Sequence, residues 1–286
     1  MGCRSLGLAA GRYKNHGARQ QTTSRAPCLF PPQPRATHVS DHIVHKLNGP
    51  ILEITLNRPE IGNAATDEMA TTITRLVGEA HGSARLIVIR GAGNDFCVGR
   101  ETMTGPRRSV DDTLERRRDH DTVFDCYSAL RNSAVPVIGV VQGRARGFGC
   151  AIAALCDLTI ASEAASFQVP EMSHNIFPTM VMSALVDRVP LKAFNHLIYT
   201  TAAISAERAL QAGIVSDVVP AAQLDEAVDS ACAAILKAPP SAVLAVKEFA
   251  RSAFDMNVAG AVDYARNLHV IINASAEVRG RRNRKA

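Results

Sequence analysis

Hydrophobic and polar positions along the chain fall into short apolar runs and longer mixed segments. The short runs Ile51–Leu56, Leu86–Ile89 and Val137–Val141 are apolar and rich in β-branched residues, which predicts β-strands. The longer segments Asp67–Ala80 and Asp112–Arg131 predict helices. Strands and helices that alternate in this way predict an α/β fold.

The last third of the chain is predicted to become mostly helical. In order, we expect a helix (Ala206–Ala212), a strand (Ile214–Val219) and two further helices (Leu224–Lys237 and Ala242–Phe254). Ser205 can cap the first of these helices and Gly213 can end it, whereas Pro239 separates the last two. We therefore expect a core domain over residues 39–220 and a C-terminal helical region over 221–278.

Two glycine-containing loops follow predicted strands. The first, GAGNDFCVGRE, covers Gly91–Glu101, and the second leads into a helix expected over Cys150–Leu155. In the second loop, Gly147 and Gly149 let the backbone approach a ligand and leave the first amides of the helix unpaired. Amides from two separate loops could then face one point, as an oxyanion hole requires.

Four segments in this order resemble the crotonase superfamily, the enoyl-CoA hydratase and isomerase family, from about Ile51 to at least Val219. They are LNRPEIGNAAT at Leu56, GAGNDFCVGRE at Gly91, QGRARGFGCAIAALCD at Gln142 and FQVPEM at Phe167. The resemblance implies an α/β fold, a spiral of ββα units with a C-terminal α-helical region that serves oligomerisation. It also implies a homotrimer or hexamer, and an acyl-CoA thioester as substrate with no permanently bound cofactor.

The resemblance also implies which residues form the site. The oxyanion-hole amides would belong to Arg100 and Phe148, and Glu171 of the PE segment would move the proton. The other positions implied to contact the substrate or coenzyme A are Asn63, Ala64, Ala65, Val98, Gly99, Gly147 and Gly149. Side chains near them have alternative roles: Glu101 can fix the loop or act in catalysis, and Arg100, Arg144 and Arg146 can meet phosphates or remain solvated.

The chain departs from the usual hydratase pattern at Ala151, where the family's first catalytic glutamate would stand. A methyl group can neither accept nor donate a proton, so the resemblance is to single-glutamate members, which are isomerases or lyases. Hydration would need another group, such as the backbone or His174, to hold the water. The segment FPTMVM at Phe177 also replaces a glycine-rich family segment. The alternative is a catalytically impaired crotonase-fold protein that binds acyl-CoA or RNA.

Apolar residues surround Glu171 in the sequence, namely Phe167, Val169, Met172, Ile176 and Phe177. A poorly hydrated carboxyl has a raised pKa, which suits a group that both takes and returns a proton. Composition alone favours a surface glutamate, and the position in the family segment favours the site. Asp157, which ends an apolar run, is expected to accept hydrogen bonds from backbone amides at a turn.

The formal net charge of +5 comes from the two ends of the chain. Residues 1–38 carry six Lys or Arg and no acid, and the basic tail 279–286 carries five. Residues 39–278 hold 21 of the 32 basic residues and all 27 acids, so the body of the protein has a net charge of −6. The leader 1–38 resembles a mitochondrial transit peptide or a disordered extension. We expect a cytoplasmic protein, with the mitochondrial matrix as the alternative.

The sequence lacks the patterns that are typical of several other classes of protein. No apolar stretch reaches the roughly 18 residues that a membrane span needs, which predicts a soluble protein. The seven cysteines form no CxxC pair and the nine histidines show no zinc spacing, so we expect buried thiols and no metal. GAGNDF lacks the third glycine of a dinucleotide fingerprint. The tails have few aromatic residues, which argues against specific recognition of single-stranded nucleic acid.

Overall fold

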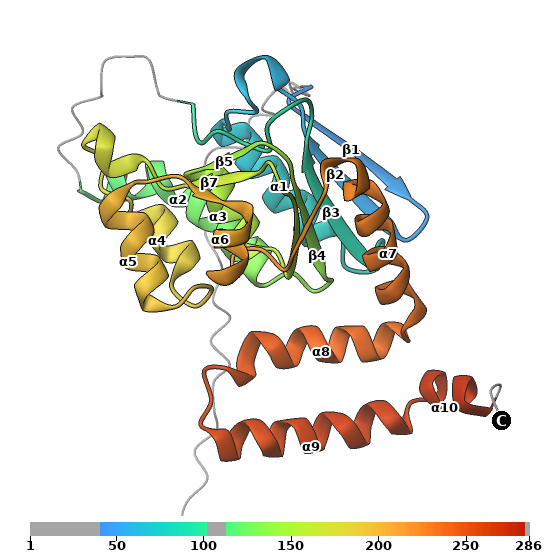
Figure 1. Ribbon diagram of the computed structural model, residues 1–286. Helices are drawn as coiled ribbons and strands as arrows, with labels where there is room; N and C mark the ends of the chain where they lie inside the picture. Colours follow the sequence, from blue (N-terminus) through green and yellow to red (C-terminus); the bar gives the residue numbers. More distant parts are fainter. Residues whose placement is uncertain (1–40, 102–112, 284–286) are drawn as a thin grey trace, which may run out of the picture. The chain divides into compact units, whose positions relative to one another are not determined.

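The computed structural model describes residues 41–101 and 113–283, which contain two β-sheets surrounded by helices (Figure 1). The larger sheet has the strand order β1-β2-β3-β4-β6-β9, and β1 pairs with β2 in the antiparallel sense whereas the other neighbours are parallel. Its strands are β1 (Ile43–Asn48), β2 (Ile51–Leu56), β3 (Leu86–Gly91), β4 (Val137–Val141), β6 (Leu158–Ser162) and β9 (Asp217–Val219). The smaller sheet contains β5 (Arg144–Arg146), β7 (Ser166–Gln168) and β8 (Ile204–Ser205).

Helices follow most strands, as the sequence predicts. Up to the end of the second sheet they are η1 (Pro59–Ile61), α1 (Asp67–Glu79), α2 (Thr113–Arg131), α3 (Phe148–Leu155), η2 (Glu171–His174), α4 (Thr179–Leu185) and α5 (Leu191–Thr200). The later helices are α6 (Ala206–Gln211), η3 (Ala221–Gln223), α7 (Leu224–Lys237), α8 (Pro240–Ala253), α9 (Val258–Ala274) and α10 (Ala276–Asn283). The α/β crotonase-like fold expected from the sequence is confirmed by this element order and by the structural relatives described below.

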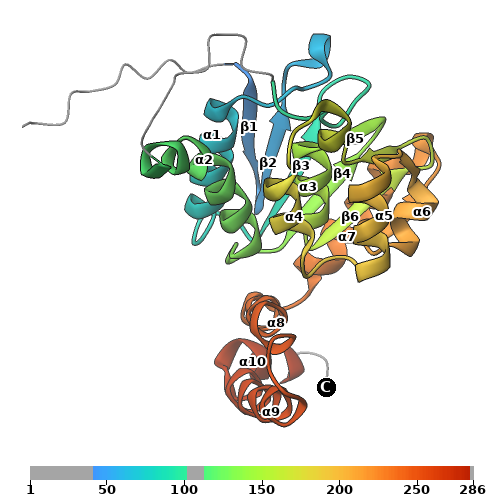
Figure 2. The same ribbon diagram turned by 90° about the vertical axis from the view of Figure 1, so that its left-hand side faces the viewer.

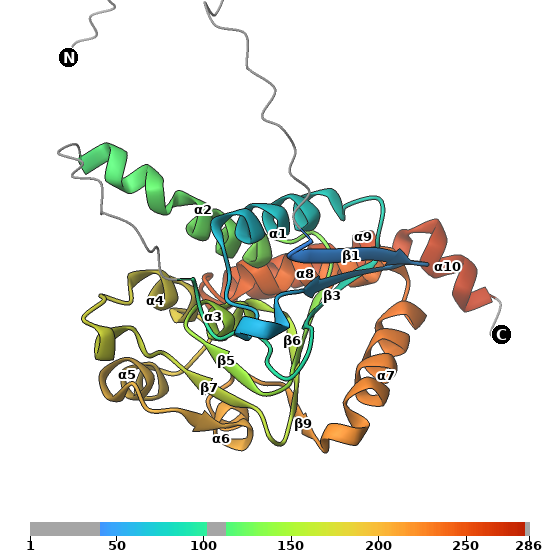
Figure 3. The same ribbon diagram turned by 90° about the horizontal axis from the view of Figure 1, so that it is seen from above.

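The strands of the larger sheet bury side chains on both faces, because successive residues point to opposite sides. In β3, Ile87 and Ile89 join the main core with α1, α2 and α3, while Leu86 and Val88 face α7. Figures 1 and 3 show α7 on the opposite side of this sheet from α1 and α2. A parallel strand buried on both faces is expected to be apolar throughout, which is why β3 and β4 were recognisable in the sequence.

The boundaries of several elements differ from those predicted, and three of the differences have a local reason. Helix α3 begins at Phe148, earlier than predicted, because Gly147 completes the preceding turn with a φ of 49°. Helix α8 begins at Pro240, since proline fits the first turn of a helix. The predicted strand Ile214–Val219 shortens to β9, because the amides of Ile214 and Val215 donate instead to the Ala209 carbonyl at the end of α6.

The C-terminal helices form a layered arrangement in which α8 and α9 lie side by side (Figures 1 and 2). The Phe249 and Tyr264 rings stack between them with centroids 5.8 Å apart. Within the described ranges, no single helix is long and apolar enough to cross a bilayer. Residues 221–237 and 240–253 reach that composition only when taken together, across a bend of 106°.

Other predictions fall partly outside the described residues. Cys97, Cys126, Cys150, Cys156 and Cys232 are buried free thiols, whereas Cys3 and Cys28 lie in the leader 1–38, outside the described part of the chain. The end of the basic tail, residues 284–286, also lies outside it.

Ser205 caps α6 as predicted, since its hydroxyl accepts a hydrogen bond from the Arg208 amide, and Gly213 follows that helix with a φ of 80°.

Candidate active site

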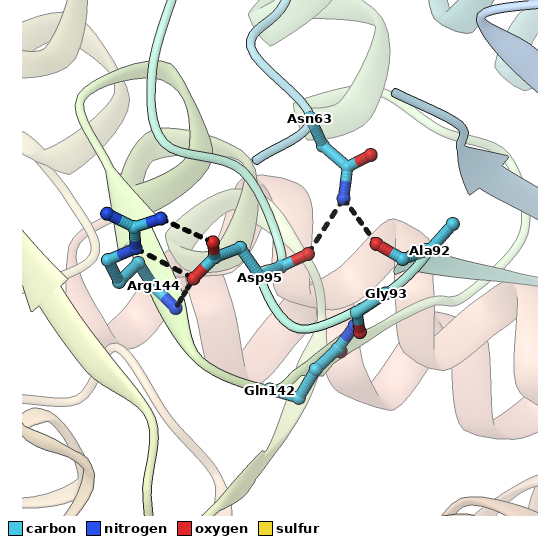
Figure 4. Close-up of polar contacts among 6 residues, drawn as sticks. All are labelled: Asn63, Ala92, Gly93, Asp95, Gln142 and Arg144. Carbon is cyan, nitrogen blue, oxygen red and sulfur yellow. Dashed lines mark hydrogen bonds and ion pairs between the residues drawn. The ribbon is translucent and has the colours of Figure 1, made fainter. Parts of the chain in front are cut away.

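The site is built on a hydrogen-bond network that holds the Gly91–Glu101 loop in place (Figure 4). Asn63 is fully buried, adopts a φ of 57°, and donates from Nδ2 to the carbonyls of Ala92 and Asp95 at 2.8 Å each. Its Oδ1 accepts from the Arg58 amide at 2.8 Å. The NA segment therefore has a structural task that its sequence did not reveal: Asn63 ties it to the start of the first glycine loop.

The same loop is tied to the second glycine loop by two side chains drawn in Figure 4. Gln142 donates to the carbonyls of Gly91 and Gly93 at 2.7 and 3.2 Å. Arg144 binds Asp95 through Nε and Nη2 at 2.8 and 2.6 Å, and its hydrogen bonds lower the pKa of Asp95. Two loops that are distant in the sequence are thereby fixed as one unit.

The backbones of the two loops also pair directly. The Cys97 amide donates to the Arg144 carbonyl at 3.0 Å, and the Arg146 amide donates to the Cys97 carbonyl at 2.9 Å. A Cβ atom added to Gly149 would lie 2.3 Å from the Cys97 carbonyl oxygen, so only glycine fits there. A Cβ atom added to Gly147 would lie 3.8 Å from the Gly99 Cα. Gly147 and Gly149 thus lie where the second loop packs against the backbone of the first.

The amides of Arg100 and Phe148 are available at this junction. The Ala65 amide donates to the Gly99 carbonyl and the Glu101 amide donates to the Ala65 carbonyl, so the Arg100 N–H points away from Ala65. Phe148 opens α3, where the first amides have no intrahelical acceptor. Among the backbone hydrogen bonds of the described residues, neither N–H has an acceptor.

The remaining predicted contact positions lie around the same junction. The Ala64 carbonyl accepts from Arg58 Nη1 at 2.9 Å, and Ala65 is 1% exposed. The Val98 amide donates to the Gly62 carbonyl at 2.9 Å, and the Val98 side chain packs against Gly62.

Glu171 reaches the junction from the 3-10 helix η2. Its Oε1 lies 2.6 Å from the position that a Gly147 Cβ would occupy, and its Oε2 is buried without a hydrogen-bond partner among the described residues. Burial is the main cause that raises the pKa of Glu171, while the nearby His174 lowers it. An ionisable oxygen without a partner at the meeting point of two loops is typical of a functional carboxyl.

The prediction that apolar side chains surround Glu171 is only partly confirmed. Phe167 and Val169 are fully buried, but Met172, Ile176 and Phe177 are 42%, 49% and 72% exposed. They point to solvent because η2 and the loop after it lie at the surface. The Glu171 carboxyl is instead desolvated on the side that faces Gly147 and α3. His174, which we considered as a group that could hold a water molecule, is exposed.

The charged side chains near the site are mostly paired with one another. Arg100 forms an ion pair with Asp67 and contacts Met180 Sδ at 3.7 Å. Glu101 pairs with Arg58 at 2.8 Å, which lowers the pKa of Glu101 and assigns it the loop-fixing role. Of the three arginines that could meet phosphates, Arg100 and Arg144 therefore have carboxylate partners. Arg146 has a buried Nε without a partner among the described residues.

Sequence reasoning missed two pairings, that of Lys247 with Asp157 beyond the C-terminal end of α3 and that of Tyr127 with Phe148 at the site. Asp157 accepts from the Val137 amide at 2.8 Å, as expected for a turn, but it also binds Lys247 of α8 at 2.6 and 2.7 Å. Tyr127 of α2 is buried, and its ring stacks on that of Phe148 with centroids 5.6 Å apart. Neither partnership has a local sequence signal, because the partners lie on separate elements.

Ala151 is fully buried in α3, so the position of the first family glutamate holds only a methyl group. The described residues contain no group of three His, Cys, Asp or Glu side chains that could hold a metal ion. The described residues therefore offer two backbone N–H groups without backbone acceptors and one desolvated carboxyl that lies against Gly147.

Comparison with known proteins identifies the family. The family model for enoyl-CoA hydratase/isomerase matches residues 46–284, so the chain belongs to the enoyl-CoA hydratase/isomerase family, within the crotonase superfamily. The enoyl-CoA hydratase domain-containing protein 3 of Rattus norvegicus, a protein named as mitochondrial, is 32% identical over 184 residues, which cover 62% of this chain and 59% of that protein.

Two further relatives match over more of their length. The 2,3-dehydroadipyl-CoA hydratase of Escherichia coli K12 is 28% identical over 233 residues, covering 79% of this chain and 88% of that protein. A crystal structure from Thermobifida fusca YX, described as an enoyl-CoA hydratase in complex with CoA, is 28% identical with a TM-score of 0.73 and covers 82% and 93% of the two chains. The chain spans only about three fifths of the mitochondrial relatives that it matches, at 59% and 58%.

Proposed function

We propose that the protein is an acyl-CoA-processing enzyme that stabilises a thioester enolate in a backbone oxyanion hole, with Glu171 as the proton carrier. The observation that carries the proposal is the desolvated Glu171 carboxyl where the two glycine loops meet: its Oε1 lies against Gly147, and its Oε2 is buried without a partner among the described residues. Membership of the enoyl-CoA hydratase/isomerase family and the CoA complex of a relative support the choice of substrate class.

The simplest reaction for this arrangement is the shift of a double bond. The thioester oxygen accepts hydrogen bonds from the N–H groups of Arg100 and Phe148 while Glu171 removes a proton from C2 of a 3-enoyl thioester. The electron pair moves towards the carbonyl oxygen and forms a dienolate, whose charge the amides stabilise. Glu171 then returns the proton to C4, which leaves the double bond between C2 and C3 and regenerates the carboxylate.

Hydration is the second reaction open to this site. It would add the oxygen of a water molecule to C3 of a 2-enoyl thioester and a proton to C2, with Glu171 as the only carboxyl of the family pair. Because the Ala151 side chain has no group that can bind or activate water, the water would have to be held by backbone groups or by the substrate itself. The name of the Escherichia coli relative, a hydratase, keeps this reaction in the test.

The test uses a panel of 2-enoyl and 3-enoyl CoA thioesters in heavy water, followed by mass spectrometry. Isomerisation shifts the double bond with deuterium exchange, and hydration adds one water. Glu171→Gln should lower either turnover by about 10²–10⁴-fold, since it removes general acid–base catalysis. Glu163→Gln, at an exposed turn, is the matched control and should keep full activity.

Two outcomes would contradict the proposal. Full activity of Glu171→Gln would remove this residue from the mechanism. Binding of CoA thioesters or of RNA by the wild type, without turnover of any thioester, would favour the catalytically impaired binding protein instead.

We further propose that the protein forms a trimer or hexamer through its C-terminal helices. The support is a set of exposed apolar side chains on and between α8 and α9, namely Leu244, Val246, Phe254, Met256, Val258, Val262, Val270 and Ile271. Light scattering of the purified protein measures the oligomeric state, and a monomer would contradict this proposal.

The name of the rat relative is compatible with a mitochondrial location, which cell fractionation would test.

A further inference from the structure

Tyr127 connects helix α2 to the first residue of α3. Its side chain is 4% exposed, and its ring lies on the Phe148 ring with centroids 5.6 Å apart and an interplanar angle of 29°. Phe148 itself is 2% exposed. The stack is therefore a buried contact between two helices, and it falls on the residue whose amide is one of the two proposed oxyanion donors.

Both the backbone and the side chain of Phe148 bear on the direction of its amide. Gly147 precedes it with φ 49° and ψ −111°, a conformation for which glycine is suited, and the Gly147 carbonyl accepts from the Ala151 amide at 3.0 Å. An oxyanion donor must lie about 2.7–3.1 Å from the developing charge, so small rotations of the amide plane matter. A stacked, buried ring fixes the side chain of Phe148 and, through it, the direction of its N–H.

The hydroxyl of Tyr127 lies within electrostatic reach of the site. Burial raises the pKa of Tyr127 well above its usual value, the Glu171 carboxylate raises it further, and the Arg100 guanidinium opposes this. The phenol therefore stays neutral at physiological pH and cannot serve as a base. This leaves the ring and its stack as the part of Tyr127 that the geometry assigns to the site.

We propose that Tyr127 is a positioning residue for the oxyanion hole: its ring holds Phe148 so that the Phe148 amide stays aimed at the thioester oxygen. The inference rests on the proposed function, because it gives a role to a residue that supports one of its two donors. Tyr127 does not touch the reacting atoms in this account. It acts through the packing of α2 against α3.

The experiment compares Tyr127→Phe, which keeps the ring, with Tyr127→Leu, which keeps an apolar side chain but removes the stack. Tyr127→Leu should lower kcat at least about tenfold, because misplacing a donor weakens transition-state stabilisation. Its KM and its Kd for free CoA should change less than about threefold, since those contacts are made elsewhere. Tyr127→Phe should keep kcat within about threefold of the wild type.

The matched control is Tyr264→Leu, which removes a comparable stack from the α8–α9 pair, where the Phe249 and Tyr264 rings are 5.8 Å apart at 22°. It should leave kcat unchanged. Phe148→Leu provides a second route if Tyr127→Leu does not fold, because it removes the same stack and keeps the amide. Its kcat should fall by a similar factor, and the double variant should be no worse than either single variant.

A spectroscopic readout separates this inference from the proposed function. The carbonyl stretch of a bound acyl-CoA should shift to lower frequency in the wild type, and the shift should shrink in Tyr127→Leu. Wild-type kcat in a folded Tyr127→Leu, or an equal loss in Tyr127→Phe, would overturn the role of the ring. A wild type that binds acyl-CoA with a shifted carbonyl but shows no turnover would refute the proposed reaction and not the positioning role.

Discussion

Replacement of Gly147 by alanine tests the geometry at the centre of the site. The added Cβ would lie 2.6 Å from Glu171 Oε1, whereas ordinary van der Waals contacts begin at 3.4 Å. The carboxyl oxygen would therefore have to move by about 0.8 Å, the difference between these two distances. The φ of 49° with ψ of −111° adds backbone strain of about 1–3 kcal/mol for a residue with a Cβ atom.

The displacement should affect catalysis more than folding. A misplacement of about 1 Å in a reacting group can cost about 10²-fold in rate, so we expect a fall in kcat of about 10- to 100-fold. The free energy of unfolding should fall by about 1–3 kcal/mol, which leaves most of the protein folded. Steady-state kinetics with the best thioester and urea denaturation measure the two effects separately.

The control for this experiment is Gly78→Ala, in helix α1. A Cβ at Gly78 would have no heavy atom within 4 Å, and this glycine lies in a regular helix. The change should leave kcat unaltered and raise stability by up to about 0.5–1 kcal/mol, because alanine is the better helix former. Wild-type kcat in a folded Gly147→Ala would refute the placement of Glu171 against Gly147.

Four further predictions concern stability and pH. Lys247→Met should lower the free energy of unfolding by about 2–4 kcal/mol in urea denaturation, because it leaves the mostly buried Asp157 carboxylate without its cation; a change below about 0.5 kcal/mol would contradict this. Asn63→Ala should cost about 2–4 kcal/mol, since it leaves two partly buried carbonyls and one amide without their partner, and calorimetry would detect it. The raised pKa of Glu171 places the acid limb of kcat/KM above pH 4.5, its usual pKa. Because a carboxyl with a raised pKa favours the folded state when protonated and loses this as pH rises, Glu171→Gln should raise Tm at about pH 8 and not at about pH 4.

The sequence predicted those parts of the fold that depend on local patterns. The strand Ile51–Leu56 and the helix Leu224–Lys237 have the predicted bounds, because hydrophobic periodicity is a property of consecutive residues. The strand predicted from Ile214 failed at its start, where the backbone amides serve the end of α6 instead. The hydrogen bonds that end α6 at this point outweigh the preference of Ile214 and Val215 for a β-strand.

The candidate site was predictable where it depends on glycines and on a motif. Gly147, Gly149 and Glu171 could be selected from the sequence, and the structure brings Glu171 against Gly147. The stack of Tyr127 on Phe148 and the ion pair of Lys247 with Asp157 could not be selected, because each depends on how segments far apart in the sequence pack together. The exposure of Phe177 also contradicted a neighbourhood inferred from sequence proximity alone.

The ion pair between Lys247 and Asp157 has a consequence for where the chain can be shortened. Asp157 also receives the backbone amide that opens β4, so one carboxylate links the central sheet to a helix that begins after Pro239. A gene truncated at that proline would remove Lys247 and leave the Asp157 carboxylate, whose side chain is only 25% exposed, without its cation. The smallest fragment able to fold by itself should therefore extend through α8, well past the proline at 220 where the composition changes.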